Sequence, residues 1–266
     1  MKIIKYIAYL FLLLTLTACQ QKPEAANVIK VGVIAGPDEQ VLQIAKEVAK
    51  QQYDLNLKII SFSDYTIPNA ALNDGSIDAN IFQHQPYLDA AIKANKYKLV
   101  AIGKTFIFPM GIYSKKYTSI NQIPNNATVA VPNDPSNEAR ALLLLTKAGL
   151  ITLKPNANTN ATVMDIASNP KNLKIKELDA AQLPRVLPDV AIAVINTNYA
   201  IPAGLNPAKD AIYSESSDSP YANIIVVRTA DENVPKLLML VKIMHSQAIL
   251  DAAKKIYAGQ AVPAWQ

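Results

Sequence analysis

Hydrophobic positions along the chain follow two alternating spacings. Runs of about four to eight apolar and β-branched residues are typical of buried strands, whereas apolar residues three or four apart are typical of amphipathic helices. The two patterns alternate from residue 28 onward. We expect strands over 28–35, 55–62, 77–82, 98–103, 128–131, 173–178, 190–195 and 224–227, and helices over 39–51, 68–73 and 135–148, from Pro86, and within 234–257.

Local signals mark the ends of some of these elements. Gly75 is placed to end the helix over 68–73 in the left-handed conformation. Asp134 precedes Pro135 and predicts an N-cap, because proline lacks the N–H that would stay unpaired at the first helical position.

Alternation of strands and helices predicts parallel β-α-β units and hence an α/β protein. The strand over 190–195 is apolar on both faces, which is typical of a sheet covered by helices on both sides. The pattern restarts near residue 128. We therefore expect two lobes with a ligand cleft between them, although the pattern alone also allows one continuous doubly wound sheet.

The N-terminus has the layout of a bacterial export signal. Two lysines precede an apolar run over 7–19, and this run is shorter than the roughly 20 residues of a membrane-spanning helix. The sequence LTAC at 16–19 is similar to a lipobox, in which Cys19 would carry lipid. We expect a signal peptide over 1–18 and a lipidated tether over 19–27; the alternative is a signal that merely ends near a cysteine.

Composition narrows the possible functions. Half of the residues are apolar and 18% are charged, which favours a folded chain. The net charge is +5, but no run of Lys and Arg exceeds two residues, so we expect no nucleic-acid partner. Cys19 is the single cysteine and the two histidines lie far apart in sequence, so we expect no disulfide, metal site or cofactor.

Aromatic residues gather in two predicted loops of the first half. Phe62 ends the second strand and Tyr65 follows it, while Phe82 ends the third strand and is followed by His84 and then by Tyr87 near the start of a helix. Rings in such loops could hold an apolar or thioether side chain, because sulfur gains about 0.3–1.5 kcal/mol from an aromatic contact. The same rings could instead be ordinary core.

Polar candidates come from the second half. Arg140 lies near the start of a helix, where its planar fork suits a carboxylate; the alternative is an ion pair with Glu138 or a similar neighbour. Asn196 and Asn198 follow a strand, and Asn223 precedes one. Asparagine offers a donor and an acceptor and can bind a zwitterion without adding charge, although an asparagine before a strand, such as Asn223, is more often a turn residue.

Seven segments stand out together, in the order VGVIAGPDEQV, DYTIPNAALNDGSIDANIFQHQPYLD, YKLVAIGKTFIFP, VAVPNDPSNEARALLLL, NPKNLKIKELDAAQLPR, AVINTNYA and SPYANIIVVR. With them the chain resembles the methionine-binding lipoproteins of the NlpA/MetQ family over essentially its whole length. The resemblance implies a two-lobed periplasmic-binding-protein fold, type II-like. We expect lobe 1 over 28–110 plus 220–266 and lobe 2 over 111–219.

The resemblance also implies a function. The chain would be a monomeric receptor, lipid-anchored in the cell envelope and facing the periplasm or exterior, that passes methionine to an ABC importer made of a permease and an ATPase. Some members of the family prefer D-methionine or a methionine-containing dipeptide, and the choice stays open here. The lobes would close across hinges near 106–113 and 214–224.

Site residues follow from the same resemblance. Arg140 would pair with the α-carboxylate, Asn223 would hold the amino-acid head, and one of Asn196 and Asn198 would contact the ligand. The thioether side chain would lie among Tyr65, Phe82, His84 and Tyr87.

The rival hypothesis is an enzyme on this scaffold, for which the residues themselves offer His84 with Asp64 as the candidate acid–base pair.

Overall fold

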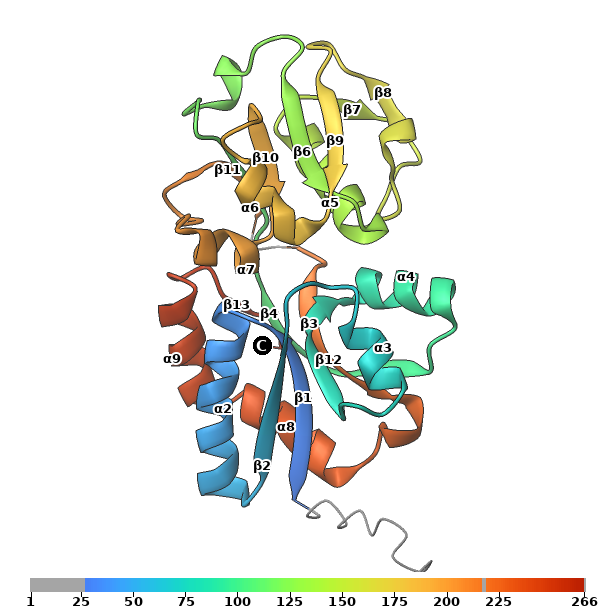
Figure 1. Ribbon diagram of the computed structural model, residues 1–266, viewed down its shortest axis with the longest axis vertical. Helices are drawn as coiled ribbons and strands as arrows, with labels where there is room; N and C mark the ends of the chain where they lie inside the picture. The colour runs from blue at the N-terminus through green and yellow to red at the C-terminus, as the bar shows by residue number, and fades with distance from the viewer. Residues whose placement is uncertain (1–26, 217–218, 266) are drawn as a thin grey trace, which may run out of the picture.

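The computed structural model describes residues 27–216 and 219–265 and contains two mixed sheets, one in each lobe (Figure 1). The first sheet has the spatial order β13 (Val262–Pro263), β4 (Leu99–Ile107), β12 (Ala222–Arg228), β3 (Ala79–His84), β1 (Val28–Ile34) and β2 (Asn56–Phe62). The second has the order β11 (Ala211–Ser214), β5 (Gly111–Tyr113), β10 (Ile192–Ile195), β6 (Thr128–Pro132) and β9 (Lys174–Leu178). A separate pair is formed by β7 (Thr152–Leu153) and β8 (Ile166–Ser168).

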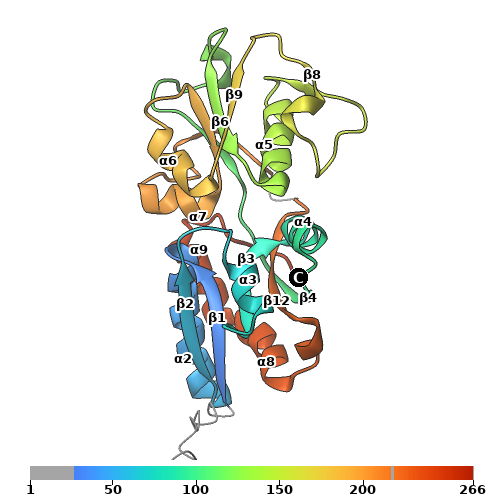
Figure 2. The ribbon, with the colours of Figure 1, turned by 45° about the vertical axis from the view of Figure 1, so that its right-hand side comes forward.

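Helices cover both faces of each sheet (Figures 1 and 2). One face of the first sheet packs on α2 (Pro37–Tyr53), α8 (Pro235–Met244) and α9 (Gln247–Ile256), and the other on α3 (Pro68–Asn73) and α4 (Gln85–Asn95). In the second sheet one face packs on α5 (Pro135–Lys147), and the other on α6 (Leu183–Val186) and α7 (Thr197–Ala200). The prediction of two lobes is confirmed, and the alternative of one continuous sheet is wrong.

Strand direction differs in part from the parallel arrangement that the alternation predicts. β1 pairs in parallel with β2 and β3, and β6 pairs in parallel with β9 and β10. However, β12 lies antiparallel between β3 and β4, and β5 lies antiparallel to β10. The antiparallel direction of β12 arises because this strand brings the chain back from the second lobe.

The chain crosses between the lobes twice. The first crossing, 108–110, joins β4 to β5, and the second joins β11 to β12 and is described over 215–216 and 219–221. Gly111, the first residue of β5, lets the ring of Tyr113 pack against the backbone, because a Cβ there would lie 2.7 Å from Cε2 of Tyr113. This distribution of strands supports the expected limits of the lobes, which stay a prediction.

Several local predictions are confirmed. The helix over 68–73 is α3, and Gly75 after it has a φ of 86°. Asp134 caps α5 by accepting the N–H of Asn137. The signal peptide and Cys19 lie outside the described residues. Within the described part of the chain, no helix combines the length and the apolar character needed to cross a membrane.

A half-buried carboxyl group lies where the first turn of α2 meets the end of α9. Asp38 accepts a hydrogen bond from the hydroxyl of Tyr257, and Val41 and Met244 lie around the same small cavity. Burial raises the pKa of Asp38 to about 7, against the opposing effect of the Tyr257 hydrogen bond. The folded chain therefore holds this proton more tightly than the unfolded chain does.

This proton predicts an unusual pH dependence of stability. Since the folded-state pKa is raised from 3.8 to about 7, the contribution of Asp38 should fall as pH rises through this range and then stay constant. Asp38→Asn should increase the free energy of unfolding at pH 8 by about 2 kcal/mol and change it little at pH 4. Urea unfolding at both values measures this; Asp251→Asn, an exposed site on α9, is the control. An equal effect at both pH values would contradict the prediction.

Candidate functional site

A cavity lies between the two lobes, with about 380 Å³ of empty space when the part open to solvent is included, and small-molecule sites typically lie in clefts of this kind. Both lobes and the first crossing contribute to its wall. Its lining residues are Tyr65, Phe82, Gln83, His84, Tyr87, Phe108, Asn137, Arg140, Asn196, Thr197, Asn198 and Asn223.

Strand ends place these side chains. β3, β6 and β10 all end at the cleft, and α4, α5 and α7 begin there, as expected for ligands bound at the carboxyl ends of parallel strands. β12 runs in the opposite direction and therefore brings its first residues to the same place. Asn223 pairs with His84 across the β12–β3 ladder.

Four rings from the first lobe form one wall of the cavity. Phe82 lies 5.9 Å from Tyr65 and 5.6 Å from Tyr87, measured between ring centroids, and His84 lies 6.4 Å from Tyr87. Tyr87 donates its hydroxyl to the backbone carbonyl of Tyr65, which orients the Tyr87 ring, and the hydroxyl of Tyr65 donates to Asn198. Tyr199 of the second lobe packs against Tyr65 at 5.0 Å. This wall suits an apolar or thioether group.

Asn137 connects the polar wall of the second lobe. Its Nδ2 donates to both carboxylate oxygens of Asp134 at 3.0 Å. Its Oδ1 accepts from Asn196 Nδ2 at 2.9 Å and lies 3.4 Å from Nε2 of His84. Asn137 thus joins the N-terminus of α5 to both lobes and fixes the orientation of the Asn196 amide.

Two buried amide atoms in the cavity wall have no hydrogen-bond partner among the residues that the structure describes. Asn196 Oδ1 is an unpaired acceptor, and Asn198 Nδ2 is an unpaired donor, because Oδ1 of Asn198 already accepts the hydroxyl of Tyr65. Asn223 also lines the cavity, and its side-chain amide makes no hydrogen bond with the described residues. Buried polar groups are normally paired, so these atoms favour a polar ligand in the cavity.

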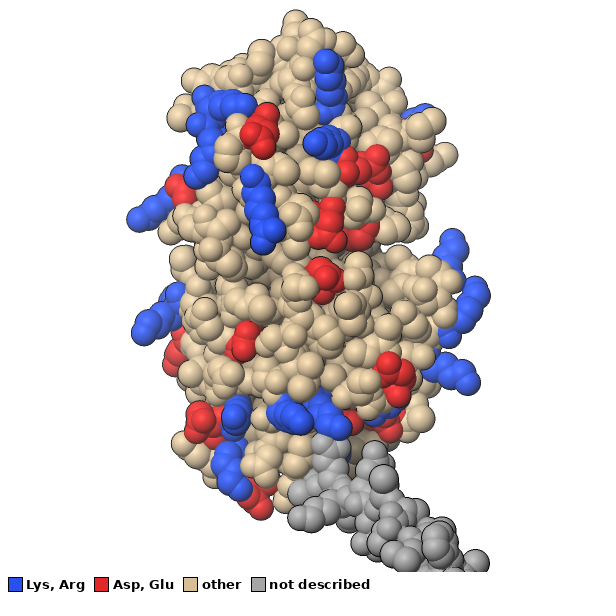
Figure 3. Space-filling model, viewed as in Figure 1, with Lys and Arg blue, Asp and Glu red and all other residues tan. Residues whose placement is uncertain are grey.

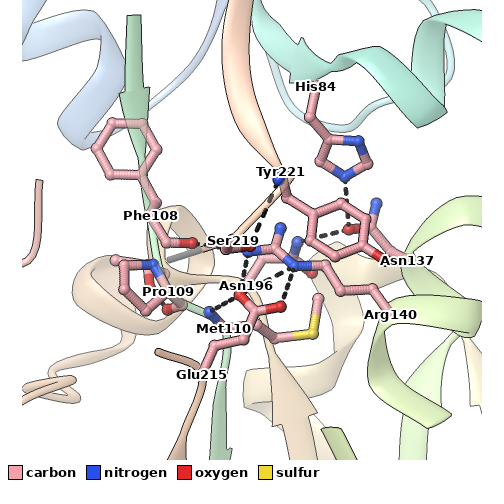
Figure 4. A network of polar contacts seen from close by, with 11 residues as sticks. His84, Phe108, Pro109, Met110, Asn137, Arg140, Asn196, Glu215, Ser219 and Tyr221 are labelled. Atoms are coloured by element: carbon pink, nitrogen blue, oxygen red, sulfur yellow. Dashed lines mark hydrogen bonds and ion pairs between the residues drawn. The ribbon is translucent and has the colours of Figure 1, made fainter. Parts of the chain in front are cut away.

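Arg140 is held by a carboxylate that the sequence prediction did not include (Figure 4). Its Nε lies 3.0 Å from Oε1 of Glu215, and its Nη2 lies 2.5 Å from Oε2. Nη2 also donates to the carbonyl of Phe108 at 3.0 Å. The ring of Tyr221 covers the guanidinium, 4.5 Å from its carbon to the centroid. Nη1 has no hydrogen-bond partner among the described residues and belongs to a side chain that lines the cavity.

The histidine of the site is neutral, and the nearby carboxyl group of Asp134 lies at a helix N-terminus. Burial and the nearby Arg140 guanidinium lower the pKa of His84 to about 3, so its imidazole is neutral at physiological pH. Burial raises the pKa of Asp134, and hydrogen bonds from Asn137 and Ser136 oppose that effect. The carboxylate of Asp134 lies at the N-terminus of α5, where the helix dipole stabilises negative charge.

All eight ligand-binding residues expected from the sequence line this one cavity. Arg140 does form an ion pair, but with Glu215 rather than with Glu138. The carboxylate of Glu138 instead accepts the backbone N–H of Val163. Sequence reasoning missed the roles of Asn137 and Tyr221, although both lie inside segments that it singled out. Glu215 gave no local signal, because its role arises only from the second crossing.

The proposed acid–base pair is not assembled. Asp64 accepts hydrogen bonds from Ser63 and Thr66, whereas His84 contacts Asn137 and two tyrosine rings. The described residues contain no group of three His, Cys, Asp or Glu side chains that could hold a metal ion. On the face in Figure 3, basic and acidic side chains are interspersed over both lobes.

Comparisons with known proteins agree on one family. A family profile described as NlpA lipoprotein matches residues 29–265. The chain is 50% identical over 254 residues to the D-methionine-binding lipoprotein MetQ of Salmonella typhi, covering 95% of this chain and 94% of that one. An ABC transporter periplasmic substrate-binding protein from Coxiella burnetii is 60% identical, with a TM-score of 0.87, covering 89% of this chain and 100% of that one. A nutrient binding protein from Burkholderia cenocepacia, bound to methionine, is 56% identical, with a TM-score of 0.88 and the same coverage.

The low pKa of His84 gives a direct test of its burial between the lobes. Its imidazole proton resonances should keep constant chemical shifts between pH 4.5 and 8, because protonation would require about pH 3. Proton NMR measures this, and His84→Asn identifies the resonances. The unfolded chain in urea should titrate near 6.5, the ordinary value. A midpoint above pH 5 in the folded chain would show that the ring is hydrated and not enclosed.

Proposed function

The chain belongs to the NlpA lipoprotein family, and from this membership and its site we propose that it is an extracytoplasmic binding protein that captures methionine and delivers it to an ABC importer. The observation that carries the proposal is the match between the cavity and an amino acid. Unpaired donors, an unpaired acceptor and a ring cluster line one space between the lobes.

Each part of methionine has a complementary wall. The α-carboxylate accepts from Nη1 of Arg140 and Nδ2 of Asn198, and the ammonium group donates to Oδ1 of Asn196. Asn223 offers an amide oxygen and nitrogen to the same head group. The thioether lies against Phe82 and the rings beside it, where sulfur–aromatic contacts stabilise it.

Binding without catalysis fits this geometry best. General acid–base catalysis needs a titratable pair within reach of one substrate, and the described cavity offers a neutral imidazole, asparagine amides and an already paired guanidinium. The related proteins reported above are all named as binding proteins. We therefore assign no reaction to the site.

The stereochemistry of the ligand is a second question. The name of the Salmonella relative specifies D-methionine. The two enantiomers differ in the positions of the hydrogen and the ammonium group on the α-carbon. A site can bind both if its head-group amides accept either arrangement. We propose L-methionine as the main ligand. Isothermal titration with L-methionine, D-methionine and glycyl-methionine on refolded, ligand-free protein ranks the three candidates.

Ligand binding should stabilise the fold by mass action. L-Methionine at 100 times its Kd should stabilise the refolded protein by about 2.7 kcal/mol and raise its Tm, whereas aspartate and lysine should not. Differential scanning fluorimetry measures the shift. No shift at millimolar methionine would contradict the proposed ligand.

Asn223 should carry part of the binding free energy. Asn223→Ala should weaken methionine binding by about 2 kcal/mol, because it leaves part of the desolvated head group without a partner. The matched control is Asn121→Ala, an exposed asparagine of the second lobe. Titration calorimetry measures both, and equal affinities in the two variants would show that the head group lies elsewhere.

The membrane anchor is part of the same proposal. We propose that the chain is lipidated at Cys19, functions as a monomer in the cell envelope and is held near a permease and ATPase of a methionine importer. Cys19→Ser should move the protein from the membrane fraction to the soluble envelope fraction, seen by immunoblotting. Retention of the variant in the membrane would contradict anchoring through Cys19.

A further inference from the structure

Glu215 determines which nitrogen of Arg140 is left unpaired. It occupies Nε and one edge of Nη2, and Phe108 occupies the other hydrogen of Nη2. Of the five guanidinium hydrogens, the two on Nη1 are left for a ligand. A carboxylate in the cavity therefore meets one nitrogen of Arg140, not the full fork that the sequence suggested.

Glu215 also balances the charge of Arg140. The side chains of Arg140 and Glu215 are 4% and 8% exposed, so water screens their charges weakly. His84 adds no charge, because its imidazole is neutral, and Asp134 is bound to the N-terminus of α5. Arg140 and Glu215 together leave the polar end of the cavity close to neutral.

A neutral end of this kind favours a neutral ligand over an ion. An unbalanced guanidinium would attract any carboxylate, with or without an ammonium group beside it. With Glu215 present, that attraction is reduced, and the ligand must also satisfy the unpaired Oδ1 of Asn196 with a donor. An amino-acid zwitterion satisfies both conditions, and a simple carboxylate satisfies only one.

We propose that Glu215 is a positioning residue that makes the site selective for the zwitterionic form of methionine over its carboxylate-only analogues. It acts through Arg140, by fixing the guanidinium edge that reaches the ligand and by cancelling its charge. The inference rests on the proposed function, since it names the form of the ligand that the same cavity accepts.

Two minimal analogues separate charge from shape. 4-(Methylsulfanyl)butanoate lacks only the ammonium group of methionine, and 3-(methylsulfanyl)propylamine lacks only the carboxylate. The wild-type protein should bind the butanoate at least about 100-fold more weakly than methionine, because an amide acceptor is left unpaired and the head site is neutral. Butanoate binding as tight as methionine binding would overturn the inference without any variant.

Glu215→Gln keeps the size of the side chain and removes its charge. In this variant the affinity gap between methionine and the butanoate should narrow at least about tenfold, and the propylamine should bind about tenfold more weakly. Glu215→Asp keeps the charge and should retain most of the wild-type gap. Glu232→Gln, which removes an exposed carboxylate beyond the far end of β12, should leave the gap unchanged.

A double variant tests whether charge is the cause. Arg140→Gln with Glu215→Gln removes both charges together, which spares the fold an unpaired buried ion. In this double variant the affinity gap between methionine and the butanoate should stay as large as in the wild type, even though methionine itself binds more weakly. A gap that is equal in the wild type and the folded Glu215→Gln variant would overturn the role of Glu215.

The outcomes distinguish this inference from the function on which it rests. A wild-type protein that fails to bind methionine overturns both. A wild-type protein that binds methionine, with a gap insensitive to Glu215→Gln, overturns only the selectivity role. Circular dichroism and Tm confirm folding of each variant, and titration calorimetry supplies the three affinities.

Discussion

A buried guanidinium must be paired, and much of the cleft is arranged around this requirement. Leaving such a charge unpaired costs several kcal/mol, so Arg140 can lie between the lobes only with a carboxylate beside it. Glu215 comes from the second crossing, Phe108 from the first, and Arg140 from α5. One ion pair thereby brings together a helix of the second lobe and both connections between the lobes.

The same pair is linked to the backbone of the crossings. Glu215 accepts the N–H of Met110 through its side chain and donates its own N–H to the carbonyl of Met110. Thr197, at the start of α7, donates its hydroxyl to the carbonyl of Pro109. The first crossing is therefore hydrogen-bonded on both sides, and the polar end of the cavity and the connections share the same atoms.

Much of this arrangement could be predicted from the sequence, for identifiable reasons. Alternating patterns gave the strands and helices, and the Asp134-Pro135 cap located α5 and with it Arg140. Residues at carboxyl ends of parallel strands, such as His84 and Asn196, follow a general rule of α/β folds. β5 and β11 are three and four residues long and carry too little periodicity to be recognised. Glu215 could not be assigned from the sequence, because its partner lies 75 residues away in the chain. The antiparallel direction of β12 was missed, because it depends on how the chain returns from the second lobe.

The shared use of atoms by the head site and the crossings has an evolutionary consequence. In a receptor whose hinge and pocket are separate, mutation could adjust ligand preference while leaving the rate of opening unchanged. Here, replacing Glu215 or Phe108 alters the ligand environment and the connecting strands in one step. The ligand environment and the connections between the lobes are therefore expected to change together among descendants of this chain, and new preferences should arise more readily through the ring wall, which lies away from the crossings.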